Sequence, residues 1–158
     1  MRRHTLDSQQ DVCTTYRKAA ANLAELRGSA NVRVVHGVDA TQLVSTLKPA
    51  RNTKVRTSYD CVVWNFPYPM GEGRIPGDVC GELMRGFFRS VSSVLEDGGQ
   101  VRVTLAMRQG GTTKELQSQR GWRIEDVAEN EGFDLIEVLP FKASVYDGYE
   151  PRRAGPRN

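Results

Sequence analysis

The sequence predicts an α/β domain with a doubly wound, mostly parallel sheet. Segments with the apolar spacing of helices alternate along the chain with short β-branched or alternating runs. The run at 61–64 is continuously apolar, which is typical of a parallel strand covered on both faces. The length of 158 residues fits one domain of this class. We expect this domain to cover 1–149 and the Arg- and Pro-rich segment 150–158 to be a flexible tail.

Four segments have the spacing and the end signals of helices. Apolar residues recur in them at steps of three and four, which places these residues on one face. The predicted helices cover 8–27, 41–47, 78–96 and 122–131. Asp7 or Ser8 can cap the first helix, and Gly28 and Gly132 follow the ends of the first and the last.

Four shorter runs are predicted strands. They cover 32–35, 59–66, 101–107 and 133–139, and the third alternates apolar and polar residues. The start of the chain is unusual, because only Thr5-Leu6 precedes an acidic residue and a long helix. A doubly wound sheet normally begins with a buried strand and a glycine-rich turn. We therefore expect an N-terminally truncated form of this fold.

Composition narrows the class of protein. No apolar run is long enough to cross a bilayer, and the N-terminus lacks the apolar core of a signal peptide. The three cysteines, Cys13, Cys61 and Cys80, have no metal-ligand spacing and indicate reduced thiols in an intracellular protein without a metal. The net charge of +3 is compatible with a nucleic-acid partner without requiring one.

The residues that end the strands are the candidates for ligand binding, because ligands of open α/β sheets bind at the carboxyl ends of the strands. The carboxylate of Asp7 could accept hydrogen bonds from ribose hydroxyls or could cap a helix. Asp39 could accept from the amine of an adenine or could cap the helix at 41–47. No nucleophilic triad and no phosphate-binding glycine loop is recognisable.

The most specific motif is Asn65-Phe66-Pro67-Tyr68, at the end of a strand. It resembles the (Asn/Asp/Ser)-Pro-Pro-aromatic loop of methyltransferases that act on planar nitrogens, with Phe66 in place of the first proline. An amide and a rigid proline turn could hold a planar base. The alternative interpretation is a strand that ends in a Pro-rich turn.

Several motifs in order resemble one known family. They are Val35-His36-Gly37-Val38-Asp39-Ala40-Thr41, Tyr59-Asp60 through Trp64-Asn65-Phe66-Pro67, Asp97-Gly98-Gly99 with Val103-Thr104-Leu105, and Tyr146-Asp147-Gly148-Tyr149 with Arg152-Arg153. From about Leu6 to Arg153 the chain is similar to the Rossmann-like domain of the large-subunit rRNA uridine-N3 methyltransferases.

This resemblance implies a class I fold that uses S-adenosylmethionine. It implies a ribose contact for Asp7 and adenine-side contacts for Asp39 and Ala40. It also implies that Asn65, Phe66 and Pro67 face the methyl donor and the target base, so that Asn65 belongs to both the cofactor site and the catalytic site. The family's first strand and its glycine-rich loop have no counterpart here.

The leading hypothesis is therefore an enzyme that methylates N3 of a uridine in large-subunit rRNA, located in the nucleolus or cytoplasm and more readily a monomer than an oligomer. Arginines would contact the RNA, although for any single one of them surface solvation is the better explanation. The candidates are Arg51, Arg56, Arg108, Arg152 and Arg153. The alternatives are a non-catalytic RNA-binding or interaction module, and a gene whose true start lies upstream.

Overall fold

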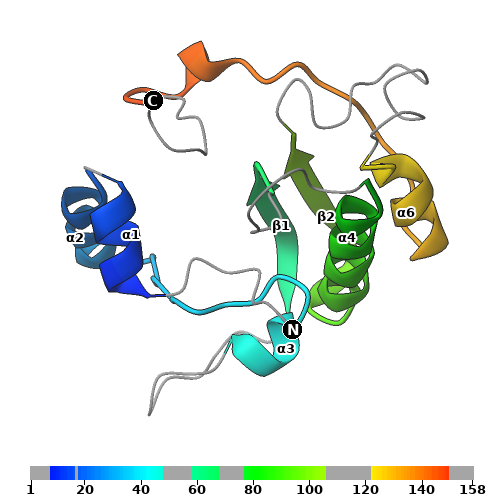
Figure 1. Cartoon of the computed structure of the whole chain (residues 1–158), viewed down its shortest axis with the longest axis horizontal. Helices are drawn as coiled ribbons and strands as arrows, with labels where there is room; N and C mark the ends of the chain where they lie inside the picture. Colours follow the sequence, from blue (N-terminus) through cyan, green and yellow to red (C-terminus); the bar gives the residue numbers. More distant parts are fainter. Residues whose placement is uncertain (1–7, 17, 48–57, 68–76, 106–121, 150–158) are drawn as a thin grey trace.

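A parallel pair of strands lies at the centre of the molecule (Figure 1). The computed structural model describes residues 8–16, 18–47, 58–67, 77–105 and 122–149. Within these ranges β1 (Tyr59–Asn65) pairs with β2 (Leu95–Thr104), and α4 (Gly77–Ser92) lies between them in the chain. Two of the predicted strands are thereby confirmed, and so are the mixed α/β class and the parallel pairing.

The pairing of β1 and β2 is irregular at one point. The register shifts just after Tyr59, opposite the segment 97–99 that the sequence predicted as a break. Gly98 has a φ of +75°, which favours glycine. A Cβ atom at Gly99 would lie 2.8 Å from the Leu95 side chain, so this turn has no room for one. The two glycines therefore shape the start of β2.

The core is formed mainly by α4, which contacts both the sheet and α6 (Ile124–Asn130). Leu83, Phe87 and Val91 of α4 are buried, and so is Val94 just after the helix, whereas Val79 is 38% exposed. The remaining buried residues of this core are Leu43, Cys80, Met84, Phe88, Trp122 and Val127. Because α4 covers the sheet, the packing of this helix holds β1 and β2 in place.

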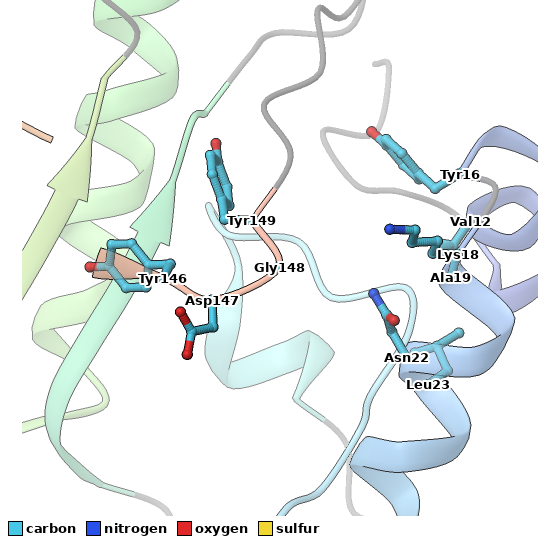
Figure 2. A pocket seen from close by; sticks show the side chains of 10 residues that line it. All are labelled: Val12, Tyr16, Lys18, Ala19, Asn22, Leu23, Tyr146, Asp147, Gly148 and Tyr149. Carbon is cyan, nitrogen blue, oxygen red and sulfur yellow. The ribbon is translucent and has the colours of Figure 1, made fainter. Parts of the chain in front are cut away.

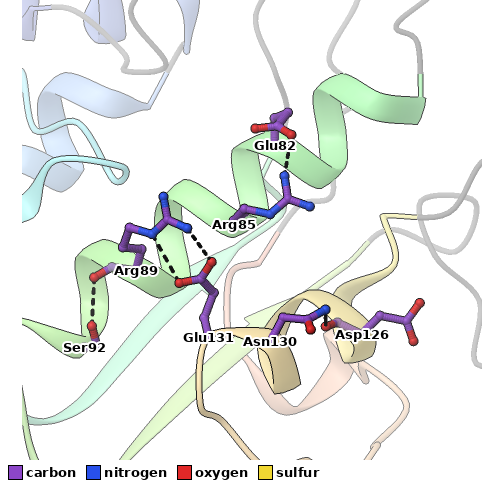
Figure 3. Close-up of polar contacts among 7 residues, drawn as sticks. All are labelled: Glu82, Arg85, Arg89, Ser92, Asp126, Asn130 and Glu131. Atoms are coloured by element: carbon purple, nitrogen blue, oxygen red, sulfur yellow. Dashed lines mark hydrogen bonds and ion pairs between the residues drawn. The ribbon is translucent and has the colours of Figure 1, made fainter.

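The end of α6 is closed by local backbone hydrogen bonds and is joined to α4 by an ion pair. Gly132, at φ +85°, allows the amide of Phe133 to donate to the carbonyl of Ala128, as in a Schellman motif. The ion pair joins this end of α6 to α4. The guanidinium of Arg89 on α4 donates to both carboxylate oxygens of Glu131, at 2.7 and 3.2 Å (Figure 3). This pairing raises the pKa of Arg89.

The single helix predicted over 8–27 is two helices, α1 (Gln9–Thr15) and α2 (Ala19–Gly28). The first helix ends at Tyr16, whose backbone is extended. Of the two predicted caps, Ser8 takes the role, and its hydroxyl exchanges hydrogen bonds with Asp11 in a capping box. The predicted helix at 41–47 is shorter, α3 (Leu43–Thr46).

Two predicted strands do not form. The segment 32–35 is without regular secondary structure, and so is 133–139. The side chains of Leu135, Ile136, Val138 and Leu139 are all more than half exposed, so neither face of that segment is covered. A strand needs a neighbour to bond its backbone, and the β-branched composition of a segment does not supply one. The described sheet has two strands, and a doubly wound sheet remains a prediction.

Among the helices that the structure describes, none has the length and apolar character needed to cross a bilayer. The predicted tail 150–158 lies outside the described residues.

Candidate functional site

The carboxyl ends of β1 and β2 bring two polar side chains together. Asn65 and Thr104 are register partners at the ends of the two strands. The Thr104 hydroxyl donates a hydrogen bond of 2.8 Å to the Oδ1 atom of Asn65, and the Phe66 amide donates to the Thr104 carbonyl at 2.8 Å. This bond restrains the exposed Asn65 side chain, and its Nδ2 group can donate to a ligand. The sequence argument had not selected Thr104 for this site.

The backbone turns sharply directly after Asn65. Phe66 has a φ of +53°, a left-handed conformation that is uncommon for a bulky residue and costs about 1–3 kcal/mol. Pro67 is fully buried and anchors the turn. A strained residue beside an exposed amide is typical of a ligand-binding turn. Asn65, Phe66 and Pro67 therefore form one ordered turn, which we call the Asn65–Pro67 corner. Tyr68, the fourth residue of the predicted motif, lies outside the described residues.

Phe66 belongs to a group of four rings that we call the aromatic cluster: Phe66, Phe141, Tyr146 and Tyr149. The ring centroids of Phe66 lie 5.2 Å from Phe141 and 6.4 Å from Tyr149. Phe141 and Tyr146 are stacked, with centroids 5.5 Å apart and planes inclined by 14°. The cluster extends the site from the end of β1 to the segment 141–149.

A cavity of about 560 Å³ lies beside the aromatic cluster. Figure 2 shows Tyr146 and Tyr149 on one side of it, and Tyr16, Lys18 and Asn22 on the other. Its volume is within the range of small-molecule sites, and its walls combine aromatic rings with a few polar groups. The sequence argument did not select these residues, although Tyr146 and Tyr149 were part of a family motif.

Asp39 takes part in a local turn. Its Oδ1 atom accepts hydrogen bonds from the amide of Thr41 at 2.9 Å and from the hydroxyl of Thr41 at 2.7 Å. This turn leads into α3, which lies by the amino end of β1 (Figure 1). Asp39 does not cap α3, whose N-cap residue is Gln42 and has no side-chain capping bond, so the capping alternative is wrong. The bonds to Thr41 close a turn ahead of the helix, and a contact of Asp39 with an adenine stays a prediction. Ala40 is half-buried against the core.

Asp7 lies outside the described residues, as do the five arginines proposed to contact RNA. Burial raises the pKa of the Cys80 thiol, which makes it a weak nucleophile, and Cys80 belongs to the core. The described residues include no group of three or more His, Cys, Asp or Glu that could hold a metal ion.

A parallel pair of strands, with an exposed amide and a left-handed turn at its carboxyl end, has the arrangement in which open α/β sheets bind ligands. The chain matches, over residues 3–153, a family described as rRNA (uridine-N3-)-methyltransferase BTM5-like. It belongs to this BMT5-like family, which confirms the resemblance inferred from the motifs. The description of that family names methyl transfer to rRNA.

The chain is also similar to parts of longer curated proteins that carry other names. A ferredoxin-fold anticodon-binding domain-containing protein 1 homolog of Mus musculus is 36% identical over 84% of this chain, which covers 20% of that protein. A heavy metal-associated isoprenylated plant protein of Arabidopsis thaliana is 31% identical over 97% of this chain, or 28% of that protein. The chain thus spans less than a third of these relatives. No solved structure matches the chain.

Proposed function

We propose that this chain is an S-adenosylmethionine-dependent methyltransferase that transfers a methyl group to N3 of a uridine in large-subunit rRNA. The observation that carries the proposal is the Asn65 amide, held by Thr104 at the carboxyl end of β1 in a member of the BMT5-like family. The nucleolus or the cytoplasm is the corresponding location.

The Asn65 side chain is suited to a uridine. The imide edge of the base has two carbonyl oxygens that flank the N3–H group. The Nδ2 group of Asn65 can donate to one of these oxygens, which orients the base and leaves the in-plane direction of N3 open to the methyl group. The Thr104 bond reduces the rotation of the amide, so the base would bind to an already oriented partner. The contribution of these residues to the reaction is proximity and orientation.

The proposed cofactor contacts are Asp39, Ala40, Asn65 and Asp7. Asp39 fits an adenine, because Oδ1 is engaged by Thr41 while the carboxylate has a second oxygen that can accept from the exocyclic amine. When bound, S-adenosylmethionine supplies a methyl group on a sulfonium. The Asn65–Pro67 corner would hold N3 of the base in line with that methyl group, and the N3 proton would pass to solvent.

A calorimetric titration of the full chain with S-adenosylmethionine tests the cofactor part of the proposal. Wild type should bind. Asp39→Asn should bind at least severalfold more weakly, because it keeps an oxygen for Thr41 but removes the charge. Asp134→Asn, at an exposed carboxylate away from the site, should bind like wild type. A folded wild-type chain that gives no heat of binding would refute cofactor use by this chain.

A second candidate function is a non-catalytic RNA-binding module with the same fold. The observation that favours it is the engagement of Asp39 with Thr41, which accounts for this carboxylate without a cofactor. The two candidates separate in the same titration, because a module would bind RNA and would not bind S-adenosylmethionine.

A further inference from the structure

Three rings of the aromatic cluster are unusually exposed. Phe141 is 39% exposed, Tyr146 56% and Tyr149 37%, whereas the core ring of Phe87 is 1% exposed. Packing among the four rings covers them only in part. Core formation therefore does not explain why this segment carries three large aromatic side chains at the surface.

The geometry of the cluster is that of a preformed stack. Phe141 supports the Tyr146 ring from one side at an inclination of 14°, and its edge meets Tyr149, with centroids 5.3 Å apart. A planar ligand that stacks on Tyr146 or Tyr149 would extend an ordered set of rings. Tyrosine side chains have only two χ angles, so they lose little conformational freedom when a ligand binds.

The cavity beside the cluster supplies polar groups for the edge of such a ligand. Asn22 offers an amide that both donates and accepts, and Asp147 offers a carboxylate that accepts from an N–H group. Lys18 brings a positive charge to the opposite wall (Figure 2). Flat rings, hydrogen-bonding edges and a cation together match a nucleotide: a base to stack and a phosphate nearby.

We infer that Tyr146 and Tyr149 form a stacking site for an unpaired nucleobase of single-stranded RNA, adjacent to the nucleotide held at Asn65. The link to RNA rests on the proposed function. The adenine of S-adenosylmethionine could stack on the same two rings. The position of the cluster next to Asn65 favours RNA as the ligand. Phe66 joins the cluster to the residue next to Asn65, so the cluster lies where a neighbouring nucleotide of the substrate strand would pass.

The test measures binding of a short fluorescein-labelled oligouridylate to the full chain by fluorescence anisotropy at low salt. The double variant Tyr146→Leu/Tyr149→Leu keeps apolar bulk and removes the aromatic faces, so its affinity should fall at least about tenfold. The double variant Tyr146→Phe/Tyr149→Phe should stay within about twofold of wild type, because stacking survives. Val145→Ala is the matched control, because Val145 directly precedes Tyr146 and is 67% exposed. This variant should bind like wild type.

Several results would overturn the inference. One is equal affinity of the leucine double variant, with its fold verified by circular dichroism. Another is equal binding of wild type to a duplex of the same length, because paired bases cannot stack on the protein and charge alone would then explain binding. Loss of S-adenosylhomocysteine binding in the leucine variant, with RNA binding unchanged, would assign the rings to the cofactor instead.

The outcome is separable from that of the proposed function. A chain that binds single-stranded RNA through these tyrosines and transfers no methyl group would support the stacking site and refute the enzyme. If substitution of both tyrosines changes neither methyl transfer nor the affinity for RNA, the enzyme is supported and the stacking site is refuted.

Discussion

At the scale of single residues, Asn65 is the point on which the proposed chemistry depends. Its amide lies at the end of β1, its Oδ1 atom accepts from Thr104, and the backbone turns at once into the strained Phe66. An exposed amide on a flexible loop would lose rotational freedom on binding a base, whereas the bond to Thr104 already restrains this one. Thr104 is therefore a positioning residue for Asn65.

Thr104→Val tests this role. The substitution removes the hydroxyl and keeps the β-branched shape that suits β2, so the fold should be unchanged. Loss of one such hydrogen bond should lower kcat/KM for RNA methylation about two- to tenfold and leave the affinity for S-adenosylmethionine unaltered. Thr104→Ser, which restores the hydroxyl, should recover activity. Equal rates for Thr104→Val and wild type would remove Thr104 from the account.

At the scale of the elements, the contact between α4 and the 39–41 turn joins the core to the candidate cofactor residue. A Cβ atom at Gly86 would lie 3.0 Å from the side chain of Thr41, whose hydroxyl is bonded to Asp39. The amide of Leu43 is in addition held by the Ser90 hydroxyl of α4 at 2.7 Å. Because these bonds fix the turn on both sides of Thr41, it cannot easily move away from a larger residue.

Gly86→Ala and Gly81→Ala are a matched pair on α4 that measures this contact. Nothing lies within 4 Å of a Cβ atom at Gly81, so alanine there should raise the free energy of unfolding by up to about 1 kcal/mol through helix propensity. At Gly86 the crowding against Thr41 should outweigh that gain and give a net loss of about 1 kcal/mol. Urea denaturation of both variants compares them, and equal stabilisation by the two substitutions would contradict a tight contact.

The elements also show how far sequence patterns reach. The helix predicted at 78–96 and the strands at 59–66 and 101–107 form with small shifts, because their apolar spacing matches the surface they bury. The β-branched run at 32–35 and the apolar run at 133–139 do not pair. Local composition records the preference of a segment for an extended backbone, but a strand depends on a partner elsewhere in the chain.

At the scale of the whole molecule, the candidate site was only partly predictable. The corner Asn65–Phe66–Pro67 could be selected from its local residue types. Thr104 could not, because its contact depends on the register between β1 and β2. The aromatic cluster joins Phe66 to the distant segment 141–149, for which the sequence offered only a family motif without an assigned role. Contacts between segments that are distant in the sequence could therefore not be predicted from local residue patterns.

The central claim, methylation of uridine N3 by this chain, is tested most directly by mass spectrometry of nucleosides. Large-subunit rRNA without this modification is incubated with the full chain and S-adenosylmethionine, then digested. We expect N3-methyluridine with wild type and none with Asn65→Ala, which removes the amide that orients the base while the exposed position keeps the fold intact. Absence of N3-methyluridine from the wild-type reaction with a folded chain, or an equal yield from Asn65→Ala, would contradict the account.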